Sequence, residues 1–463
     1  MQNPLPAVEN TYIAPQWGRL EFIRKMRQDQ LSVLTPNIFD RRMLSGRLFR
    51  LRWFTLNWPD YIQHVLLDNH QNYIKGRFSD ALLGPIVGEG MLTSEGAAWR
   101  RLRRIAAPAF HSRSVAEFVE EMVRCTTSML ARWQGRTEPF DIASEMTGLT
   151  LDIITRTMFS TNISGEVTRL RQLVQTVLGL TRPSAADLFG LPTWVPRIGS
   201  KKTKTRAIAE LDKMVAQILT SRRQEGDAHN DLLSLLLAAR DEETGEGLTD
   251  RQLRDEIMTI FLAGHETTAN ALAFTWYLLA THPDVDAKVQ DELARVLGGR
   301  DPVYADVAQL RYTRMVFEET LRLYPPVYQI GRMAVGPDVI GGVTIPKNAI
   351  VTIHTYVTHR NPTLWPDPER FDPERFTPER SADRHRFAYL PFGGGPRICI
   401  GQGFAMAEAV AVIASVAQRF RFSLAPGRTV QPIGLFTLRA KDGVWMTAAP
   451  RQPATHDAVV AAV

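Results

Sequence analysis

Cysteine is scarce in this sequence, with only Cys125 and Cys399 among 463 residues. Two cysteines so far apart exclude the disulfide framework of a small secreted protein, and they cannot hold an iron–sulfur cluster on their own. We therefore expect a reducing, cytoplasmic setting. Long hydrophobic runs are missing too: no segment offers about 18 unbroken apolar residues, and the first residues lack the apolar core of a signal peptide. The sequence thus predicts no membrane anchor.

An excess of one charge sign is nearly absent as well. Lys and Arg number 55 against 49 Asp and Glu, and this small basic excess is spread along the chain, which does not indicate nucleic-acid binding. Hydrophobic residues make up 44% and charged residues 22%, the balance of an ordinary globular enzyme. We expect residues 18–450 to form one domain, with an extended lead-in at 1–17 and a disordered tail at 451–463.

Hydrophobic periodicity predicts a mainly α-helical chain with small β-sheets (α+β). A strand-like patch at 47–56 is followed by helical spacing to about residue 324, and short strand-like pieces then occur at 341–357 and 430–446. One more helix is predicted after Cys399. Strands from the two ends of the chain should therefore pair in a small sheet beside a large helical body.

The stretch FGGGPRICIG, residues 392–401, surrounds Cys399 with glycine. Gly393, Gly394 and Gly395 can adopt positive φ and carry no Cβ, so the main chain can turn sharply there and approach another group closely. The helix predicted after Cys399 brings unpaired N–H groups near the sulfur, which favours a thiolate. The alternative is a buried structural cysteine in a turn.

The stretch AGHETT, residues 263–268, lies in the middle of a long predicted helix. Thr249 and Gln252 form a plausible capping box at its start, and about 30 residues make a rod of about 45 Å, long enough to cross the domain. Gly264 is unfavourable inside a buried helix. The Thr267 hydroxyl can bond to the carbonyl four residues back and open a groove in the helix. The alternative is a kinked core helix with a satisfied polar patch.

Two more stretches place charged residues on helices. In EETLRLYPP, Glu319 and Arg322 stand three apart and can pair on one helical face. In WRRLRRIAAPAFH, Trp99 and Arg103 share a face while the other arginines spread around the helix. Taken alone, both patterns are typical of solvated surface helices.

These stretches, in this order and spacing, resemble the cytochrome P450 family from about residue 40 to 446. The family's haem-binding signature F-x-x-G-x-R-x-C-x-G is matched by Phe392, Gly393, Gly395, Arg397, Cys399 and Gly401. The resemblance implies that Cys399 is the axial ligand of the iron in haem b (iron protoporphyrin IX), where a thiolate favours O–O cleavage. It also implies that Phe392 packs beside the sulfur and that Arg397 meets a haem propionate.

The AGHETT stretch matches the family's motif over the distal face of the haem. The resemblance implies that Glu266 and Thr267 are catalytic residues that steer water and protons to dioxygen. Ala263 and Gly264 would lie against the haem in the same stretch. His265 fills a variable position of the motif and receives no catalytic role.

Other residues acquire roles from the same resemblance. It implies contacts to the haem propionates from Trp99, Arg103 and Arg332, and a buried structural triad of Glu319, Arg322 and Arg375. Arg370 lies in a neighbouring copy of the same short motif and is the alternative third member of the triad. The remaining arginines of the Trp99 helix, Arg100, Arg101 and Arg104, would help to form a docking surface for an electron donor.

The resemblance also implies a fold and a reaction. The fold is a triangular prism with a long central helix over the haem. The reaction inserts one atom of O2 into an apolar small molecule, by hydroxylation or epoxidation, and reduces the other atom to water. Because no flavin or iron–sulfur region is visible, electrons would come from a separate ferredoxin or flavodoxin with an NAD(P)H-dependent reductase. The stretches GMLTSEGAAWRRLRRIAAPAFH and GPRICIGQGFAMAEA resemble the fatty-acid and terpenoid hydroxylases of the family, which favours a fatty acid or a terpenoid as substrate.

Apolar residues at four places along the chain are candidates to line the substrate pocket, and the alternative for each is ordinary core packing. They are Phe78, Leu82, Leu83, Ile86, Met91, Phe261, Ala263, Val327, Tyr328, Leu435 and Phe436. Three other functions stay open: a haem-thiolate sensor, a cofactor-free helical protein with a structural Cys399, and a peroxide-driven or isomerising relative. The intact pair of Glu266 and Thr267 argues against the first and the third.

Overall fold

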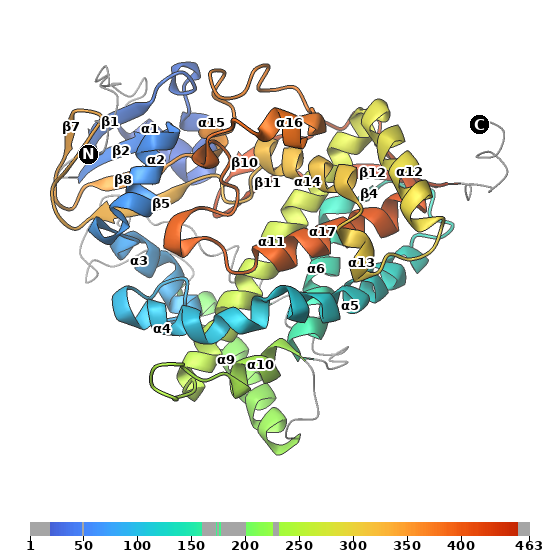
Figure 1. Cartoon of the computed structure of the whole chain (residues 1–463), viewed down its shortest axis with the longest axis horizontal. Coiled ribbons are helices and arrows are strands. Elements are labelled where there is room, and N and C mark those ends of the chain that lie inside the picture. The colour runs from blue at the N-terminus through green and yellow to red at the C-terminus, as the bar shows by residue number, and fades with distance from the viewer. Residues whose placement is uncertain are drawn as a thin grey trace.

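The computed structural model describes residues 19–48, 51–159, 201–225 and 231–451, together with Leu173 and Thr176. The predicted lead-in at 1–17 lies outside these residues, and so does the predicted tail apart from Arg451. Within them, helices form most of the molecule and four small sheets lie at its margins (Figure 1). The predicted fold class, mainly α with small β-sheets, is confirmed.

Helix α11 (Asp250–Thr281) crosses the middle of the molecule (Figure 1). It begins at the predicted capping box, in which the Thr249 hydroxyl accepts from the N–H of Gln252 and the Gln252 side chain accepts from the N–H of Thr249. Its 32 residues span about 48 Å at the usual rise per residue. Because α11 is buried along most of its length, it forms the axis around which the other helices pack.

Four helices form the wall around α11. Helix α6 (Ile142–Phe159) and helix α14 (Arg311–Leu323) pack directly against it, and α17 (Gln402–Ala417) packs against both α5 (Ser112–Ala131) and α14. Every residue of α17 from 406 to 417 is buried, which is expected of a helix that is apolar on all sides. This helix follows Cys399 directly, so the cysteine loop is anchored in the core.

The remaining helices surround this core or join its parts. They are α1 (Arg19–Gln28), α2 (Pro59–Gln63), α3 (Gly76–Val87), α4 (Gly96–Ala106), α9 (Lys201–Glu225), α10 (Leu232–Ala238), α12 (Pro283–Leu297), α13 (Tyr304–Val307), α15 (Thr355–Thr358) and α16 (Pro378–Ser381).

The largest sheet joins segments far apart in the chain, as the sequence predicted. Its strand order is β1 (Met43–Leu48), β2 (Leu51–Leu56), β8 (Ile350–Ile353), β5 (Ile330–Ala334) and β3 (Tyr73–Ile74). Strands β2 and β8 run parallel, with Trp53 opposite Ile350 and Leu56 opposite Ile353. The other pairs in this sheet are antiparallel.

Three smaller sheets complete the fold. Strand β12 (Trp445–Pro450) lies between β4 (Phe140–Asp141) and β9 (Phe420–Leu424), and two hairpins pair β6 (Asp338–Ile340) with β7 (Val343–Ile345) and β10 (Pro432–Gly434) with β11 (Leu438–Ala440). The β10–β11 hairpin matters most for the site because its turn lies against α11.

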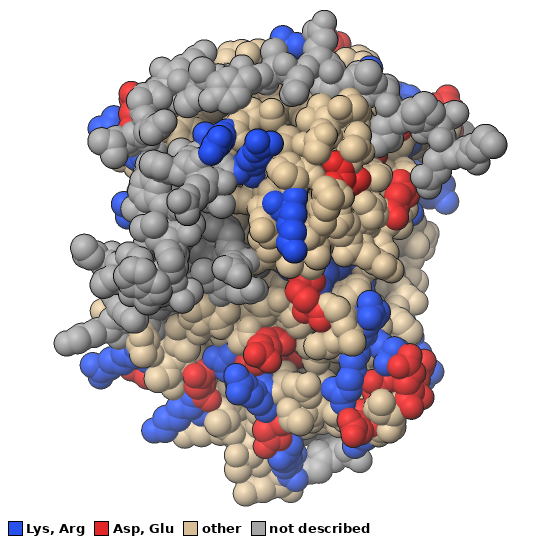
Figure 2. All heavy atoms as spheres, turned by 90° about the vertical axis from the view of Figure 1, so that its left-hand side faces the viewer, with Lys and Arg blue, Asp and Glu red and all other residues tan. Residues whose placement is uncertain are grey.

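Charges of both signs are mixed over the lower half of the face in Figure 2, as expected from the small basic excess. Among the described residues, none of the helices combines the length and hydrophobicity needed to span a bilayer.

Candidate active site

Cys399 lies in a short irregular segment between η8 (Gly395–Arg397) and α17. Its N–H donates to the carbonyl of Phe392 at 2.9 Å, which closes the loop that the glycines begin. The thiol is accessible to solvent although protein surrounds it on most sides. The side chain therefore faces an open space within the molecule.

The glycines of this loop allow a close approach to other parts of the chain. Gly393 and Gly395 have φ angles of +74° and +66°, which favour glycine. A Cβ atom on Gly395 would lie 1.8 Å from the carbonyl oxygen of Leu66. A Cβ atom on Gly394 would lie 2.5 Å from the ring of Phe387. The loop is thus fixed between main chain on one side and an aromatic ring on the other.

Burial and nearby donors have opposite effects on the pKa of Cys399. Burial raises the pKa of Cys399, while the N–H of Gly401 and the charge of Arg103 oppose the rise. Burial is the largest of these effects, whereas the N–H of Gly401, at the start of α17, lowers the pKa of Cys399 as the sequence predicts. A metal ion at the sulfur would remove the proton, and a bound cation is what this loop needs to hold a thiolate.

Two residues of α4, Trp99 and Arg103, contact the cysteine loop. Arg103 donates from Nη1 to the carbonyl of Ile398, the residue before Cys399, at 2.7 Å. The ring of Trp99 lies under the guanidinium of Arg397, with Cζ 4.4 Å from the ring centroid. The sequence placed Trp99 and Arg103 at haem propionates, and the structure brings both of them to the loop itself.

Arg397 and Arg332 form a cluster of positive charge beside the loop. Arg397 donates to the carbonyl of Ser94 at 2.9 Å and pairs with Glu95. Burial and the charge of Arg397 lower the pKa of Arg332 to about 10. Burial also lowers the pKa of Arg397, and the charge of Arg103 adds to this effect, while Glu95 opposes it. The buried Nη1 atom of Arg397 has no acceptor among the described residues. The cluster is therefore short of negative charge.

These features fit a haem. Its propionates would supply a carboxylate to Arg332 and an acceptor to the unpartnered Nη1 of Arg397, and Cys399 offers the soft sulfur donor that iron accepts. Ala263 is exposed although the residues before it on α11 are buried, so the helix presents a small side chain to open space. Cys399 would hold the iron, and the two arginines would hold the propionates.

The AGHETT stretch of α11 keeps regular α-helical structure. The Thr267 hydroxyl donates to the carbonyl of Ala263 at 2.7 Å, as predicted. Helix α11 continues through this bond, and the groove stays a prediction. A Cβ atom on Gly264 would lie 3.2 Å from Cδ1 of Ile154, so Gly264 is explained by close packing against α6.

Glu266 has two oxygens in different surroundings. Oε1 accepts from the hydroxyl of Thr437 at 2.8 Å, whereas the buried Oε2 has no partner among the described residues. Burial raises the pKa of Glu266, while Thr437 and the charge of Arg439 lower it. His265, which received no catalytic role, is buried and donates from Nδ1 to the Phe261 carbonyl at 2.9 Å. Glu266 and Glu256 are thus two acids of α11 that each keep one buried oxygen without a partner among the described residues.

Glu319 and Arg322 lie fully buried on α14. Arg322 binds both oxygens of Glu319, from Nε at 2.6 Å and from Nη2 at 2.8 Å. Nε of Arg375 lies 3.4 Å from Glu319 Oε1, whereas the Arg370 side chain is exposed and contributes its carbonyl to Arg322. The second guanidinium at this acid thus comes from Arg375, the residue chosen by its spacing to Cys399.

A buried histidine links this triad to the cysteine loop. Arg322 donates from Nη1 to the carbonyl of His359 at 2.8 Å, and His359 Nε2 accepts from the N–H of Leu390 at 2.9 Å. Leu390 then accepts through its carbonyl from the N–H of Gly393 at 3.0 Å. Burial and nearby Arg322 lower the pKa of His359 to about 3, so the histidine stays neutral and keeps the tautomer that these bonds require.

The candidate pocket residues have different surroundings. Leu83, Ile86, Met91, Phe261 and Tyr328 are buried, Leu435 and Phe436 are half-buried, and Val327 and Ala263 are exposed. The side chains of Phe78 and Leu82 lie outside the described residues. The Tyr328 hydroxyl donates to the carbonyl of Leu435 at 2.6 Å, so Tyr328 supports the β10–β11 turn.

Three acids near the site were missed by sequence analysis. Glu256 on α11 is fully buried and accepts from the N–H of Met91 at 2.7 Å, and its neighbour Asp255 accepts from the N–H of Glu89 at 2.9 Å. On α17, fully buried Glu408 hydrogen-bonds to Thr268. Each contact joins residues far apart in the chain, so a local motif carries no signal for it.

Two of the arginines predicted to dock an electron donor are engaged elsewhere. Arg104 pairs with Asp241 at 2.8 Å and Arg101 pairs with the same carboxylate at 3.3 Å. Asp241 is buried, so both arginines brace the loop after α10. Arg100 is exposed on α4, and its role in docking an electron donor stays a prediction.

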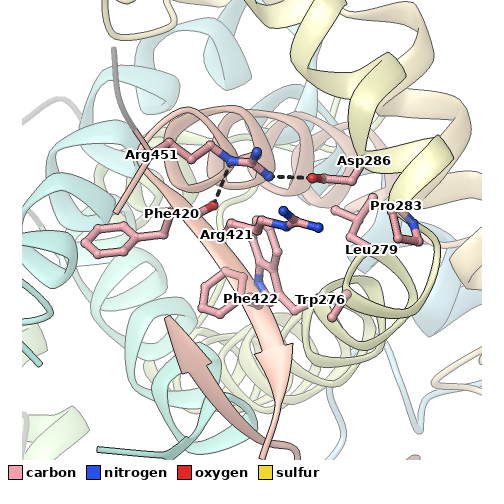
Figure 3. Close-up of a pocket in the computed structure, with 10 residues that line it drawn as sticks. Trp276, Leu279, Pro283, Asp286, Phe420, Arg421, Phe422 and Arg451 are labelled. Atoms are coloured by element: carbon pink, nitrogen blue, oxygen red, sulfur yellow. Dashed lines mark hydrogen bonds and ion pairs between the residues drawn. The ribbon is translucent and has the colours of Figure 1, made fainter. Parts of the chain in front are cut away.

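A separate pocket lies where the end of α11 meets α12 and β9 (Figure 3). Arg451 crosses it, donating to Asp286 at 2.6 and 2.7 Å and from Nε to the Phe420 carbonyl at 3.2 Å. Trp276 and Phe422 lie among its walls. Because it is lined by none of the predicted site residues, we interpret it as the anchor of strand β12.

Comparisons with known proteins agree with this geometry. The family model described as "Cytochrome P450" matches residues 42–446. The chain is similar to "Cyclooctatin synthase" of Streptomyces melanosporofaciens, with 38% identity over 82% of this chain and 83% of that protein. It is 37% identical to "Cyclooctat-9-en-7-ol 5-monooxygenase" of the same organism, over 84% of each chain. Among solved structures, the haem domain of cytochrome P450DA superimposes with a TM-score of 0.84 at 27% identity, covering 97% of this chain and 98% of that one.

Proposed function

The chain belongs to the cytochrome P450 family of haem-thiolate monooxygenases, and we propose that it hydroxylates a terpenoid over a haem b whose iron is bound by Cys399. The observation that carries the substrate class is the likeness to two terpenoid-modifying relatives over more than four fifths of each chain. The apolar candidates for the pocket wall agree with such a substrate.

The residues divide the work between two sides of the cofactor. When bound, the haem supplies the oxidation chemistry, in which O2, two electrons and two protons give one inserted oxygen atom and one water. Cys399 would be the thiolate ligand of the haem iron, and Arg397 and Arg332 would hold the propionates. Thr267 would orient water and Glu266 would supply protons, a role that fits the raised pKa of the buried Glu266.

Electrons come from a separate protein in this proposal, a ferredoxin or a flavodoxin served by an NAD(P)H-dependent reductase. The exposed Arg100 belongs to the surface at which this donor docks. Arg101 and Arg104 contribute through the loop that they brace.

The experiment is a binding screen with the haem-loaded protein. Terpenes, fatty acids and steroids are added in turn, and the shift of the iron from low spin to high spin is followed by absorption, since this shift accompanies loss of iron-bound water. We expect terpenoids to give the shift and an oxygenated product by mass spectrometry. A shift and product with fatty acids alone would contradict the proposed substrate class.

A further inference from the structure

The turn between β10 and β11 carries a buried hydroxyl that contacts the proposed catalytic acid. Thr437 is 3% exposed, and its Oγ1 donates to Glu266 Oε1 at 2.8 Å. The two residues are 171 positions apart in the chain. The contact therefore exists only because the β10–β11 hairpin is folded against α11.

A second side chain fixes the direction of this hydroxyl. Asn270, one helical turn after Glu266 on α11, donates from Nδ2 to Thr437 Oγ1 at 3.2 Å. A threonine hydroxyl has one proton to give and can accept at its lone pairs. Because Asn270 takes an acceptor position, the proton of Thr437 is directed at Glu266.

The hairpin that carries Thr437 is itself held in place. Tyr328 donates to the carbonyl of Leu435, the N–H of Leu435 donates to the carbonyl of Thr437 at 3.1 Å, and the N–H of Leu438 donates to the carbonyl of Pro326 at 2.9 Å. Thr437 therefore has little freedom to leave Glu266. The same turn presents Leu435 and Phe436, two candidates for the pocket wall.

We propose that Thr437 is a positioning residue for the acid: it holds one carboxyl oxygen of Glu266 so that the other, buried and unpartnered, stays available to pass protons. This inference rests on the proposed function, in which Glu266 supplies those protons.

The test compares Thr437→Val with Thr437→Ser in the haem-loaded enzyme. Valine keeps the shape and removes the hydroxyl, so Glu266 loses its partner and consumed electrons should appear more often as hydrogen peroxide. We expect a three- to tenfold rise in peroxide per product, about the worth of one hydrogen bond. Serine keeps the hydroxyl and should restore the wild-type ratio. The spin shift on substrate binding should stay unchanged in both variants.

The pH profile separates positioning from a merely structural role. The Thr437 hydroxyl lowers the pKa of Glu266, so its removal should move the pH dependence of the peroxide fraction to higher pH. A change in packing alone would leave the profile where it is. Thr447→Val, at an exposed hydroxyl of β12, is the matched control and should show neither change.

A readout independent of turnover comes from thermal unfolding. Thr437→Val, Glu266→Ala and the double variant form a cycle, and a direct bond between the two side chains predicts that their effects on the melting temperature are not additive. Additive effects would overturn the inference. If Thr437→Val does not fold, Asn270→Leu provides the same test, with a smaller rise in peroxide expected and an unchanged ratio contradicting the proposal.

Glu266→Gln distinguishes the positioning role of Thr437 from the proton-supplying role of Glu266. Glutamine keeps an acceptor for Thr437 and removes the acid. If Glu266→Gln raises the peroxide fraction while Thr437→Val does not, the positioning role is wrong and the proposed function stands. If Glu266→Gln itself changes nothing, the proton-supplying role of Glu266 is wrong.

Discussion

The main chain around Cys399 and the 263–270 stretch of α11 differ in how completely their polar atoms are hydrogen-bonded. Around Cys399, the N–H of the cysteine and the carbonyl of Ile398 both have partners, from Phe392 and Arg103. On α11, one oxygen of Glu266 is buried without a partner among the described residues. A main chain that is hydrogen-bonded around the cysteine holds one atom in one place, whereas an under-bonded acid can exchange its proton. The difference fits a ligand on one side of a haem and proton delivery on the other.

The cysteine loop is joined to the core through His359 and the Glu319 triad, and breaking this triad should have the largest effect. Glu319→Gln removes a buried charge from between two arginines, and such a loss costs about 3–5 kcal/mol. We expect little folded, haem-loaded protein, measured as the ratio of haem absorbance to protein after purification. Glu318→Gln is the control, because its pair with Arg314 is partly exposed and worth under about 1 kcal/mol. Normal haem loading of Glu319→Gln would contradict the structural role.

Removing the distal hydroxyl should spare the fold and disturb the chemistry. In Thr267→Ala, protons reach the site less selectively, so we expect product to fall by about 10²- to 10⁴-fold while reduced nicotinamide is still consumed and hydrogen peroxide accumulates. Thr275→Ala is a matched control, since Thr275 makes the same bond to the carbonyl four residues back on α11. Unchanged product per electron in Thr267→Ala would remove Thr267 from the mechanism.

Glu408 joins the two regions, because it lies on α17, the helix after Cys399, and hydrogen-bonds to Thr268 on α11. Burial raises its pKa from 4.5 to about 8. The folded state therefore holds this proton more tightly than the unfolded state, and wild-type stability is lost as pH rises from about 4.5 to 8. Relative to wild type, Glu408→Gln should gain stability over that window, by at most about 1.4 kcal/mol per pH unit.

Chemical unfolding at pH 5, 6, 7 and 8 measures this difference. The exposed Glu379→Gln is expected to differ from wild type by a constant amount across the series. A constant difference for Glu408→Gln would show that this carboxyl is charged in the folded protein.

The smallest effect is expected at the outer surface. Arg100→Glu reverses an exposed charge, so reduction by an acidic ferredoxin or flavodoxin should slow by a factor of a few at low salt and recover at high salt. Stopped-flow reduction across ionic strengths measures this. Equal rates at every ionic strength would place the donor elsewhere.

Much of the fold follows from local patterns. The capping box at Thr249 marks the start of α11 to the residue, and the spacing of polar groups placed the bond from Thr267 to Ala263. The alternation of strand-like segments at both ends predicted the pairing of β2 with β8. In each case the signal lies within one turn or one strand, where short-range geometry decides the structure.

The rest depends on contacts between distant segments. From the sequence, Gly264 is only an unfavourable residue inside a buried helix. The structure explains the glycine by its close packing against Ile154 on another helix. The sequence alone indicates a surface position for Arg104, because its partner Asp241 is 137 residues away in the chain and the local pattern does not reveal it. Thr437 escaped attention for the same reason. Tertiary packing decides such partners, and a single sequence gives no spacing rule for them.

The account depends most on Cys399 as the ligand, and the absorption spectrum of the ferrous carbon monoxide complex tests this directly. Wild type, Cys399→His and Cys125→Ser are purified with haem and compared, with Cys125 serving as a buried cysteine away from the loop. We predict the red-shifted band of a thiolate ligand in wild type and in Cys125→Ser, and its loss in Cys399→His, because imidazole donates less charge to iron. Survival of that band in Cys399→His would contradict the account.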